Sequence, residues 1–303
     1  MPKTTTWTGA TDSDYDTSSN WSNGLPTASD TIVIDGAVDI TGGSVTNDEC
    51  ERFYIASSYT GAVGSTGTPL EVDVAEVSVD NNTSGSTHFL HLTGSANTTP
   101  TVMVTGLKTG SALYISGVLD LVVVEPSFVG TMYIGNSASK TASIKDLVVL
   151  TSAGTVDASV AGNLAWSSSA TINMASGVLN LGENIGASGS MTVSGGTVNV
   201  SGWTLTTGDV FTLQGSGTVN WNAGSAGLSA SAITTVRTLN LISGTFTTAG
   251  NDKAYVGLND INQFGGTLDL RSSTANIDIN GTFNAYAGTF TPSKQSVVTV
   301  SPK

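Results

Sequence analysis

Cysteine, histidine and basic side chains are scarce in this chain of 303 residues. Its single cysteine, Cys50, excludes an intramolecular disulfide framework. The 10 Lys and Arg residues stand singly among 23 acidic residues, and the formal net charge is −13. A protein that neutralises phosphates needs a stripe of basic side chains, so we expect no nucleic acid partner.

The two histidines, His88 and His91, lie in the run THFLHL. Successive side chains of an extended strand alternate between its faces, so residues three apart point in opposite directions. These two rings therefore cannot bind one metal ion together or form a proton relay. We predict a structural or surface role for both.

Long hydrophobic runs are also missing. No stretch approaches the roughly 18 apolar residues of a membrane span, and the first residues lack the basic and then apolar pattern of a secretory signal. The chain has no G-x-S-x-G elbow, P-loop or dinucleotide fingerprint in the strand-to-helix context that these motifs need. We therefore expect no membrane partner, no cofactor, no conventional α/β enzyme, and folding in the cytoplasm.

Small and β-branched residues dominate what is present. Glycine contributes 36 residues, and Ser, Thr, Val and Ile fill many of the other positions. Glycine costs about 1 kcal/mol per helical position relative to alanine, whereas Val, Ile and Thr suit a pleated surface. The composition predicts an all-β protein of many short strands. The one helix that we expect is a turn or two at residues 47–53.

A repeated pattern runs through the second half of the chain: a turn of small residues, then an apolar residue, Asn or Asp, and a second apolar residue. The polar residues Asn180, Asn199, Asn220 and Asn240 are 19, 21 and 20 positions apart, and Asp269 follows after 29. About 20 residues fit one coil of three short strands and three corners. The pattern predicts a β-solenoid, expected to be a right-handed parallel β-helix.

Strand alternation assigns the two faces of each repeat. The residues that flank each Asn or Asp should stack inside the solenoid, and the polar residues should form one outer row. The expected inward stack contains Leu181, Val200, Leu241 and Leu270. Residues 1–30 are expected to form an N-terminal segment, 31–170 an irregular solenoid with longer loops, and 171–303 regular coils and the C-terminal end.

Three aromatic residues, Trp7, Tyr15 and Trp21, precede the first expected strand, within turn residues. A solenoid end needs a cap, because it would otherwise expose strand edges and apolar core. This segment, W-x-G followed by N-W-x-x-G-x-P and a D-x-x-x-I strand, resembles the opening of right-handed β-helix proteins of bacterial surfaces and tailed-phage virions. We expect the three aromatic residues to form a capping and anchoring segment.

The acidic residues give two further candidates. Asp12, Asp14 and Asp16 resemble the start of a calcium loop, but an EF-hand would have Gly at Thr17 and Glu at Asn23. Two groups of acidic residues come nearest to the carboxylate pair of a glycosidase. One contains Asp73, Glu76 and Asp80, and the other contains Asp120 and Glu125. Since charges on alternating strands normally face solvent, we expect no catalytic site. Because the EF-hand pattern is incomplete, Asp12, Asp14 and Asp16 are only a weak calcium candidate.

The resemblance implies a virion structural protein. We expect a capsid decoration, or cement, protein that stabilises a tailed-phage head. It would be a homotrimer on the capsid surface, made in the host cytoplasm and bound to the major capsid protein. The alternative is a tailspike or surface adhesin that binds host polysaccharide in an aromatic groove, with or without cleaving it. The aromatic residues available for such a groove are Tyr54, Tyr59, Tyr114, Tyr133, Trp166 and Trp203.

Overall fold

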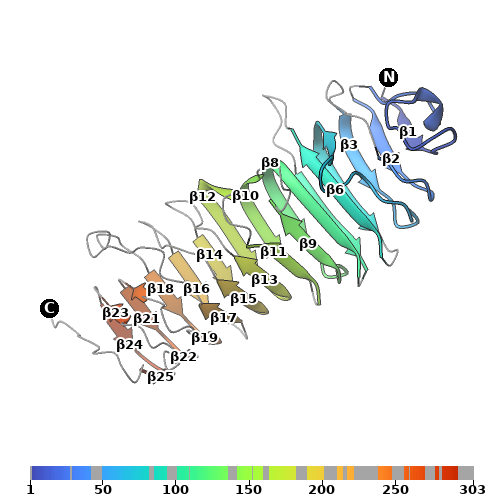
Figure 1. The fold of residues 1–303 in the computed structure, drawn as a ribbon. Coiled ribbons are helices and arrows are strands. Elements are labelled where there is room, and N and C mark those ends of the chain that lie inside the picture. Colours follow the sequence, from blue (N-terminus) through green and yellow to red (C-terminus); the bar gives the residue numbers. More distant parts are fainter. Residues whose placement is uncertain are drawn as a thin grey trace. The chain divides into compact units, whose positions relative to one another are not determined.

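In the computed structural model, most of the described residues lie in parallel strands (Figure 1). The described residues are 2–27, 29–41, 50–81, 85–93, 101–108, 110–135, 142–151, 153–159, 164–181, 190–200, 210–213, 217–221, 238–247, 256–258, 260–269, 277–279 and 282–292. They form two compact units, Met1–Leu164 and Ala165–Lys303. Each unit is a β-solenoid of stacked parallel coils, so the expected all-β solenoid fold is confirmed.

The first unit contains eleven complete strands and a short 3₁₀-helix among its described residues. They are β1 (Thr4–Trp7), η1 (Ser18–Asn20), β2 (Thr31–Ile34), β3 (Cys50–Ile55), β4 (Leu70–Val72), β5 (Val74–Asn81), β6 (Thr87–Leu92), β7 (Thr101–Leu107), β8 (Ala112–Val124), β9 (Thr131–Ile134), β10 (Ala142–Val149) and β11 (Thr155–Ala158). The helix expected at 47–53 is wrong for residues 50–53, which lie in β3, and residues 47–49 lie outside the described residues. Cys50, Phe53 and Ile55 are buried at the inward positions of this strand, and that burial favours the extended conformation.

The strands of the first unit form two stacks. One contains β1, β2, β3, β5, β7, the second half of β8 and β10, in that order. The other contains β4, β6, the first half of β8, β9 and β11. Strand β8 therefore passes from one stack to the other. Gly117 lies at this corner with a φ of +96°, and a Cβ there would lie 1.9 Å from the carbonyl oxygen of Leu92.

The core of the first unit consists of rows of apolar side chains that stack from coil to coil. One row is fully buried and runs in register through Ile32, Phe53, Val77, Val102, Val122 and Leu147. Burying one such side chain stabilises the fold by about 1.5–3 kcal/mol. The rows thus hold the coils together without a disulfide.

The second unit begins within β12 and repeats a two-strand coil. Its strands are β12 (Leu164–Met174), β13 (Val178–Leu181), β14 (Ser190–Val193), β15 (Thr197–Val200), β16 (Val210–Leu213), β17 (Thr218–Trp221), β18 (Thr238–Leu241), β19 (Thr245–Thr247), β20 (Val256–Leu258), β21 (Asp260–Gln263), β22 (Thr267–Asp269), β23 (Ile277–Ile279), β24 (Phe283–Ala285) and β25 (Thr289–Thr291). One stack contains β12, β14, β16, β18, β21 and β24, and the other β13, β15, β17, β19, β22 and β25. A third strand per coil was expected, and among the described residues only β20 and β23 form such a third pair.

A three-residue turn that ends in glycine joins the two successive strands of a coil, as in 242–244, 264–266 and 286–288. Gly266 has a φ of +69°, and a Cβ there would lie 2.6 Å from the carbonyl oxygen of Gly244 in the previous coil. That same oxygen accepts a hydrogen bond of 2.8 Å from the Thr267 amide. Only a residue without a side chain allows this approach.

The expected outer Asn row is correct in part. Asn180, Asn199 and Asn220 occupy the same register position on consecutive coils, and the Asn199 side-chain amide donates a 2.9 Å hydrogen bond to Asn180 Oδ1. Asn240 lies in the other stack, where the amide of Asn262 donates to Asn240 Oδ1 at 3.0 Å, and the position above Asn220 is taken by Thr247.

The error in the register comes from one long coil. Thr218 pairs with Thr245, 27 positions later, whereas Thr197 pairs with Thr218 after 21. The spacing of 20 from Asn220 to Asn240 therefore does not correspond to one coil. Leu241 is buried as expected, but its neighbours in register are Leu213 and Gln263, and Leu270 lies outside the described residues.

Candidate functional site

The N-terminal segment folds over the first coil as a cap. Trp7, Tyr15 and Trp21 are buried and pack edge to face, with centroids 5.2 Å apart for the two Trp rings and 4.8 Å for Tyr15 and Trp21. Trp7 Nε1 donates to the Val38 carbonyl at 3.0 Å, and Trp21 Nε1 to the Tyr15 carbonyl at 2.8 Å. These rings form the interior of the cap, and their surfaces are closed to an external partner.

The three aspartates of the calcium candidate accept local hydrogen bonds or face solvent. Asp12 Oδ1 accepts from the Asp14 amide at 3.0 Å and from Asn20 Nδ2 at 2.6 Å, and Asp14 Oδ1 accepts from the Asp16 amide at 3.0 Å. The bond from Asn20 is the main cause that lowers the pKa of Asp12. Among the described residues, no three His, Cys, Asp or Glu side chains form a group that could hold a metal ion.

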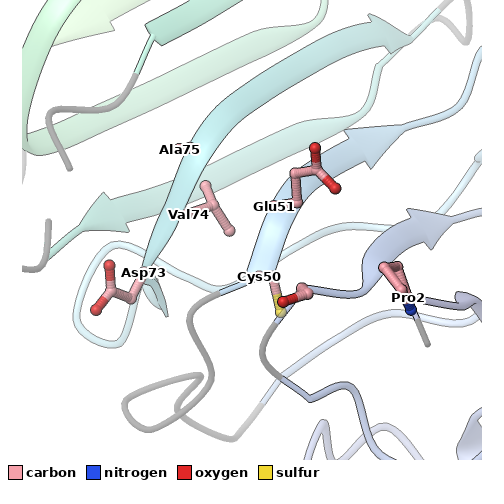
Figure 2. A pocket seen from close by; sticks show the side chains of 7 residues that line it. Pro2, Cys50, Glu51, Asp73, Val74 and Ala75 are labelled. Carbon is pink, nitrogen blue, oxygen red and sulfur yellow. The ribbon is translucent and has the colours of Figure 1, made fainter. Parts of the chain in front are cut away.

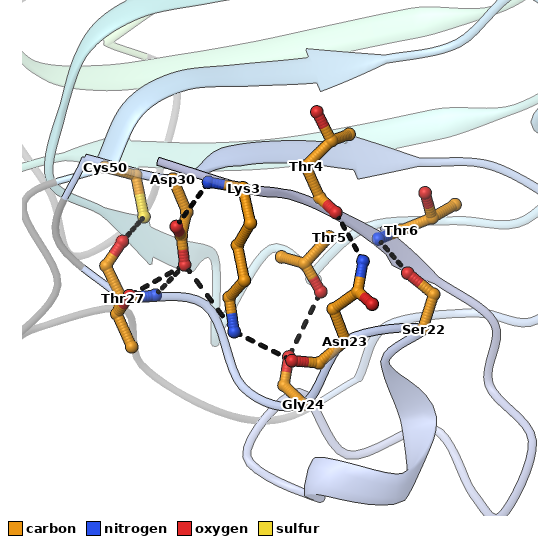
Figure 3. A network of polar contacts seen from close by, with 10 residues as sticks. All are labelled: Lys3, Thr4, Thr5, Thr6, Ser22, Asn23, Gly24, Thr27, Asp30 and Cys50. Atoms are coloured by element: carbon orange, nitrogen blue, oxygen red, sulfur yellow. Dashed lines mark hydrogen bonds and ion pairs between the residues drawn. The ribbon is translucent and has the colours of Figure 1, made fainter. Parts of the chain in front are cut away.

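A second polar network ties the first strand to the cap (Figure 3). Asp30 is buried and accepts hydrogen bonds from the amide and hydroxyl of Thr27 at 2.8 and 2.7 Å and from the Lys3 amide at 3.1 Å. Burial opposes the ionisation of Asp30, but the bonds from Thr27 and Lys3 and the charge of Lys3 outweigh it, so its pKa is lowered. This network fixes the start of the solenoid.

A pocket of about 420 Å³ opens beside this network (Figure 2). Its described lining residues are Pro2, Ser29, Cys50, Glu51, Asp73, Val74 and Ala75. The Cys50 thiol donates to the Thr27 carbonyl at 3.8 Å. Two carboxylates in the same pocket disfavour a thiolate, and the described lining includes no histidine, lysine or arginine that would favour it. The described lining therefore does not activate Cys50 as a nucleophile.

The two histidines lie on opposite faces of β6, as their spacing predicts. His88 is fully buried between Tyr59, whose ring centroid is 5.8 Å away, and its register partner Leu113. Neither of its ring nitrogens has a hydrogen-bond partner in the described part of the chain, and burial lowers its pKa to about 4. His91 faces outward, and its Nδ1 lies 3.0 Å from the Ser116 hydroxyl.

The carboxylates that the sequence groups together have different contacts in the structure. Glu76 forms an ion pair of 2.9 Å with Arg52, and Asp120 forms one of 3.1 Å with Lys145. Asp80 accepts a 3.5 Å hydrogen bond from the Tyr54 hydroxyl, while Asp73 lines the pocket. Burial, followed by the charge of Asp80, raises the pKa of Tyr54. These contacts give each carboxylate a different neighbour.

A row of three aromatic rings crosses the outer face of β6, β8 and β9. Phe89, Tyr114 and Tyr133 are half-buried and lie in register on consecutive coils. Their rings stack with centroids 4.4 and 4.5 Å apart and interplanar angles of 12° and 10°. Together with Thr131 and His91 beside them, these rings define what we name the aromatic face.

An apolar patch lies on the outer face of the other stack. Met103, Val123 and Val148 are half-buried and in register on β7, β8 and β10, and Leu121 lies two residues before Val123. Because the inward positions of these strands are filled by aliphatic residues, the side chains of this patch point away from the core. The patch is a candidate surface for contact with another molecule.

No protein family, curated protein or solved structure matches this chain.

Of the aromatic residues named from the sequence, the structure brings only Tyr114 and Tyr133 together. Tyr59 is buried, Trp166 is nearly so, Tyr54 faces outward on the other stack, and Trp203 lies outside the described residues. Phe89 was missed. Its position between His88 and Leu90, which are buried, indicated that Phe89 faces outward. The coils of the first unit vary in length, so the sequence spacing did not reveal that Phe89 lies in register with Tyr114.

Proposed function

We propose that this chain is a non-catalytic virion structural protein, a decoration protein on the capsid surface of a tailed phage. The observation that carries the proposal is the apolar patch of Met103, Leu121, Val123 and Val148 on the outside of a rigid solenoid. Half-buried apolar side chains in register on adjacent coils suit a flat contact with another protein chain. The resemblance of the N-terminal segment to virion β-helix proteins supports the same proposal.

In this proposal the patch joins three copies around a threefold axis. A homotrimer covers the apolar outer face of each solenoid, and it matches the local threefold positions of an icosahedral shell. Many copies that bridge neighbouring copies of the major capsid protein stabilise the shell by mass action. The acidic balance of the chain keeps the decorated particle soluble and away from nucleic acid.

The N-terminal cap is the proposed anchor on the capsid. Since Trp7, Tyr15 and Trp21 are buried, these rings would shape the anchor and other residues would touch the capsid. Leu25, which is 37% exposed, is the large apolar side chain available for that contact in the described part of the cap. The protein would fold in the host cytoplasm before it joins the capsid.

Sedimentation and capsid binding test the proposal. We expect the purified chain to be a trimer that binds empty capsids, and we expect Val123→Lys to give monomers that bind less. Ser78→Lys is the matched control. Ser78 lies on β5, one coil before Met103 in the same outer row, and is not one of the four residues of the patch. A wild-type chain that is monomeric and never binds capsids, or a particle reconstruction that places it only at the tail tip, would refute the proposal.

The second candidate function is that of a tailspike or surface adhesin that binds host polysaccharide. The stacked row of Phe89, Tyr114 and Tyr133 is the specific observation that favours it. Release of oligosaccharides from a surface glycan, lost when one carboxylate is replaced, would add cleavage to this candidate function and overturn the non-catalytic proposal.

A further inference from the structure

We propose that the aromatic face binds a linear, uncharged polysaccharide whose chain runs across the coils, along the row of rings. This inference does not depend on the structural role proposed above, and it specifies the ligand class and the binding mode of the second candidate function. It stands on the arrangement of Phe89, Tyr114 and Tyr133, on the polar groups beside them, and on the charge of the surrounding strands.

The tyrosine hydroxyls are the first element of the site. The rings stack face to face along the row, so their edges and hydroxyls are directed away from one another's faces. Within the described part of the chain, the Tyr114 and Tyr133 hydroxyls make no hydrogen bond. Burial, and secondarily Tyr133, raises the pKa of Tyr114, so its phenol stays protonated at neutral pH and can both donate and accept. Two hydroxyls one coil apart are thus available to a ligand.

Hydrogen-bonding side chains flank the rings on both sides. The row on one side contains the threonine hydroxyls of Thr87, Thr131 and Thr155, interrupted by Ala112. His91 lies on the other side, with its Nδ1 3.0 Å from the hydroxyl of buried Ser116. Apolar ring edges between hydrogen-bonding groups suit a sugar, which presents C–H groups and hydroxyls together.

The charge of this face selects among polysaccharides. Two outward side chains of this stack are formally charged, Glu71 on β4 and Asp157 on β11, at opposite ends of the face. The stack otherwise contains β6, the first half of β8 and β9. These strands carry no Lys or Arg. An anionic glycan would be repelled, because nothing on these strands compensates its charge. The site therefore fits a neutral chain.

The repeat of the coils sets the direction of the ligand. Neighbouring strands in a sheet lie about 4.8 Å apart, and the stacked rings follow that spacing. An extended glycan laid across the strands meets an equivalent ring edge at each coil, so each added sugar repeats the contacts of the one before. We expect affinity to rise with length until the ligand spans the three rings, and then to level off.

Calorimetric titration with neutral hexasaccharides tests this inference. The probes are cellohexaose, xylohexaose, mannohexaose and chitohexaose, with hexagalacturonate as the anionic comparison. We expect at least one neutral probe to bind, its disaccharide to bind more weakly, and the double variant Tyr114→Phe, Tyr133→Phe to weaken binding roughly tenfold. Tyr54→Phe, an outward tyrosine of the other stack, is the matched control and should leave affinity unchanged.

The outcome is decisive in either direction. Absence of binding by all four neutral probes at millimolar concentration, equal binding of hexagalacturonate, or unchanged affinity in the double variant would overturn the inference. Both substitutions remove only a hydroxyl and keep the stacked rings, so the variant should fold normally. The same variant should still form trimers and bind capsids, which separates failure of this inference from failure of the proposed function.

Discussion

The corner at Gly117 gives the sharpest test of the coil geometry. Gly117 and Gly36 share a φ of +96° within the first unit, so alanine meets the same backbone strain at both positions. Their surroundings differ. A Cβ at Gly117 would lie 1.9 Å from the carbonyl oxygen and 2.7 Å from the carbonyl carbon of Leu92, whereas nothing lies within 4 Å of a Cβ at Gly36.

The expected loss of stability has two causes, the backbone strain at positive φ and the overlap of the new Cβ with the Leu92 backbone. The unfavourable φ costs on the order of 1–3 kcal/mol in either variant. In Gly117→Ala the overlap with the Leu92 backbone adds about 1–3 kcal/mol, because the neighbouring strand must move. We therefore expect Gly117→Ala to be less stable than Gly36→Ala by about 2 kcal/mol, which corresponds to roughly 4–8 °C in melting temperature.

Urea unfolding followed by circular dichroism measures the difference. Both variants should keep the far-ultraviolet spectrum of the wild-type protein at low temperature, since one corner is a small part of the solenoid. The midpoint of Gly117→Ala should lie clearly below that of Gly36→Ala. Equal midpoints for the two variants would show that β8 does not turn against Leu92 as described.

Three further changes test other parts of the fold. The folded protein keeps His88 neutral down to about pH 4, while an unfolded histidine protonates near 6.5, so the free energy of unfolding should fall by on the order of 3 kcal/mol as pH drops through this interval. His88→Phe should abolish that part of the pH dependence in urea titrations, and an unchanged profile would contradict the burial of the ring. Leu241→Asn should cost on the order of 2–5 kcal/mol in thermal unfolding, because Leu241 is fully buried, whereas Ile242→Asn at a 45% exposed neighbour should cost about 0.5 kcal/mol or less. Asn262→Ala removes its bonds to Asn240 and Asn284 and should cost about 1–2 kcal/mol, roughly twice the effect of Asn284→Ala; equal costs would show that the ladder is not continuous.

The sequence predicted the solenoid because each repeat alternates apolar residues, which face inward, with polar residues, which face outward. The strands Val178–Leu181, Thr197–Val200 and Thr218–Trp221 each show it, and all three lie in register as predicted. The position of Asn240 could not be predicted from spacing alone, since a count of residues does not record how many corners the chain turns. The turn that follows Asn240, residues 242–244, was the better signal, because it shares its final glycine with 264–266 and 286–288.

The aromatic face was beyond sequence reasoning for a related reason. Phe89 and Tyr114 are 25 positions apart and Tyr114 and Tyr133 are 19 apart, so no fixed period connects them. Their alignment follows from the backbone pairing of β6, β8 and β9, which depends on every loop between them. Likewise, the burial of His88 follows from its position on β6, whereas its distance from Tyr59 depends on the pairing of whole coils.

The long coil between β17 and β19 has a consequence for how such a protein changes over evolution. Its 27 positions replace the 19 to 22 of the other coils in the second unit, yet the strands on either side keep their register. The pairing of strands thus constrains only the short segments within the stacks, and the number of residues between two paired strands is free to vary. The connection between such strands can acquire new peptide segments, by mutation or by design, while the paired strands keep their register.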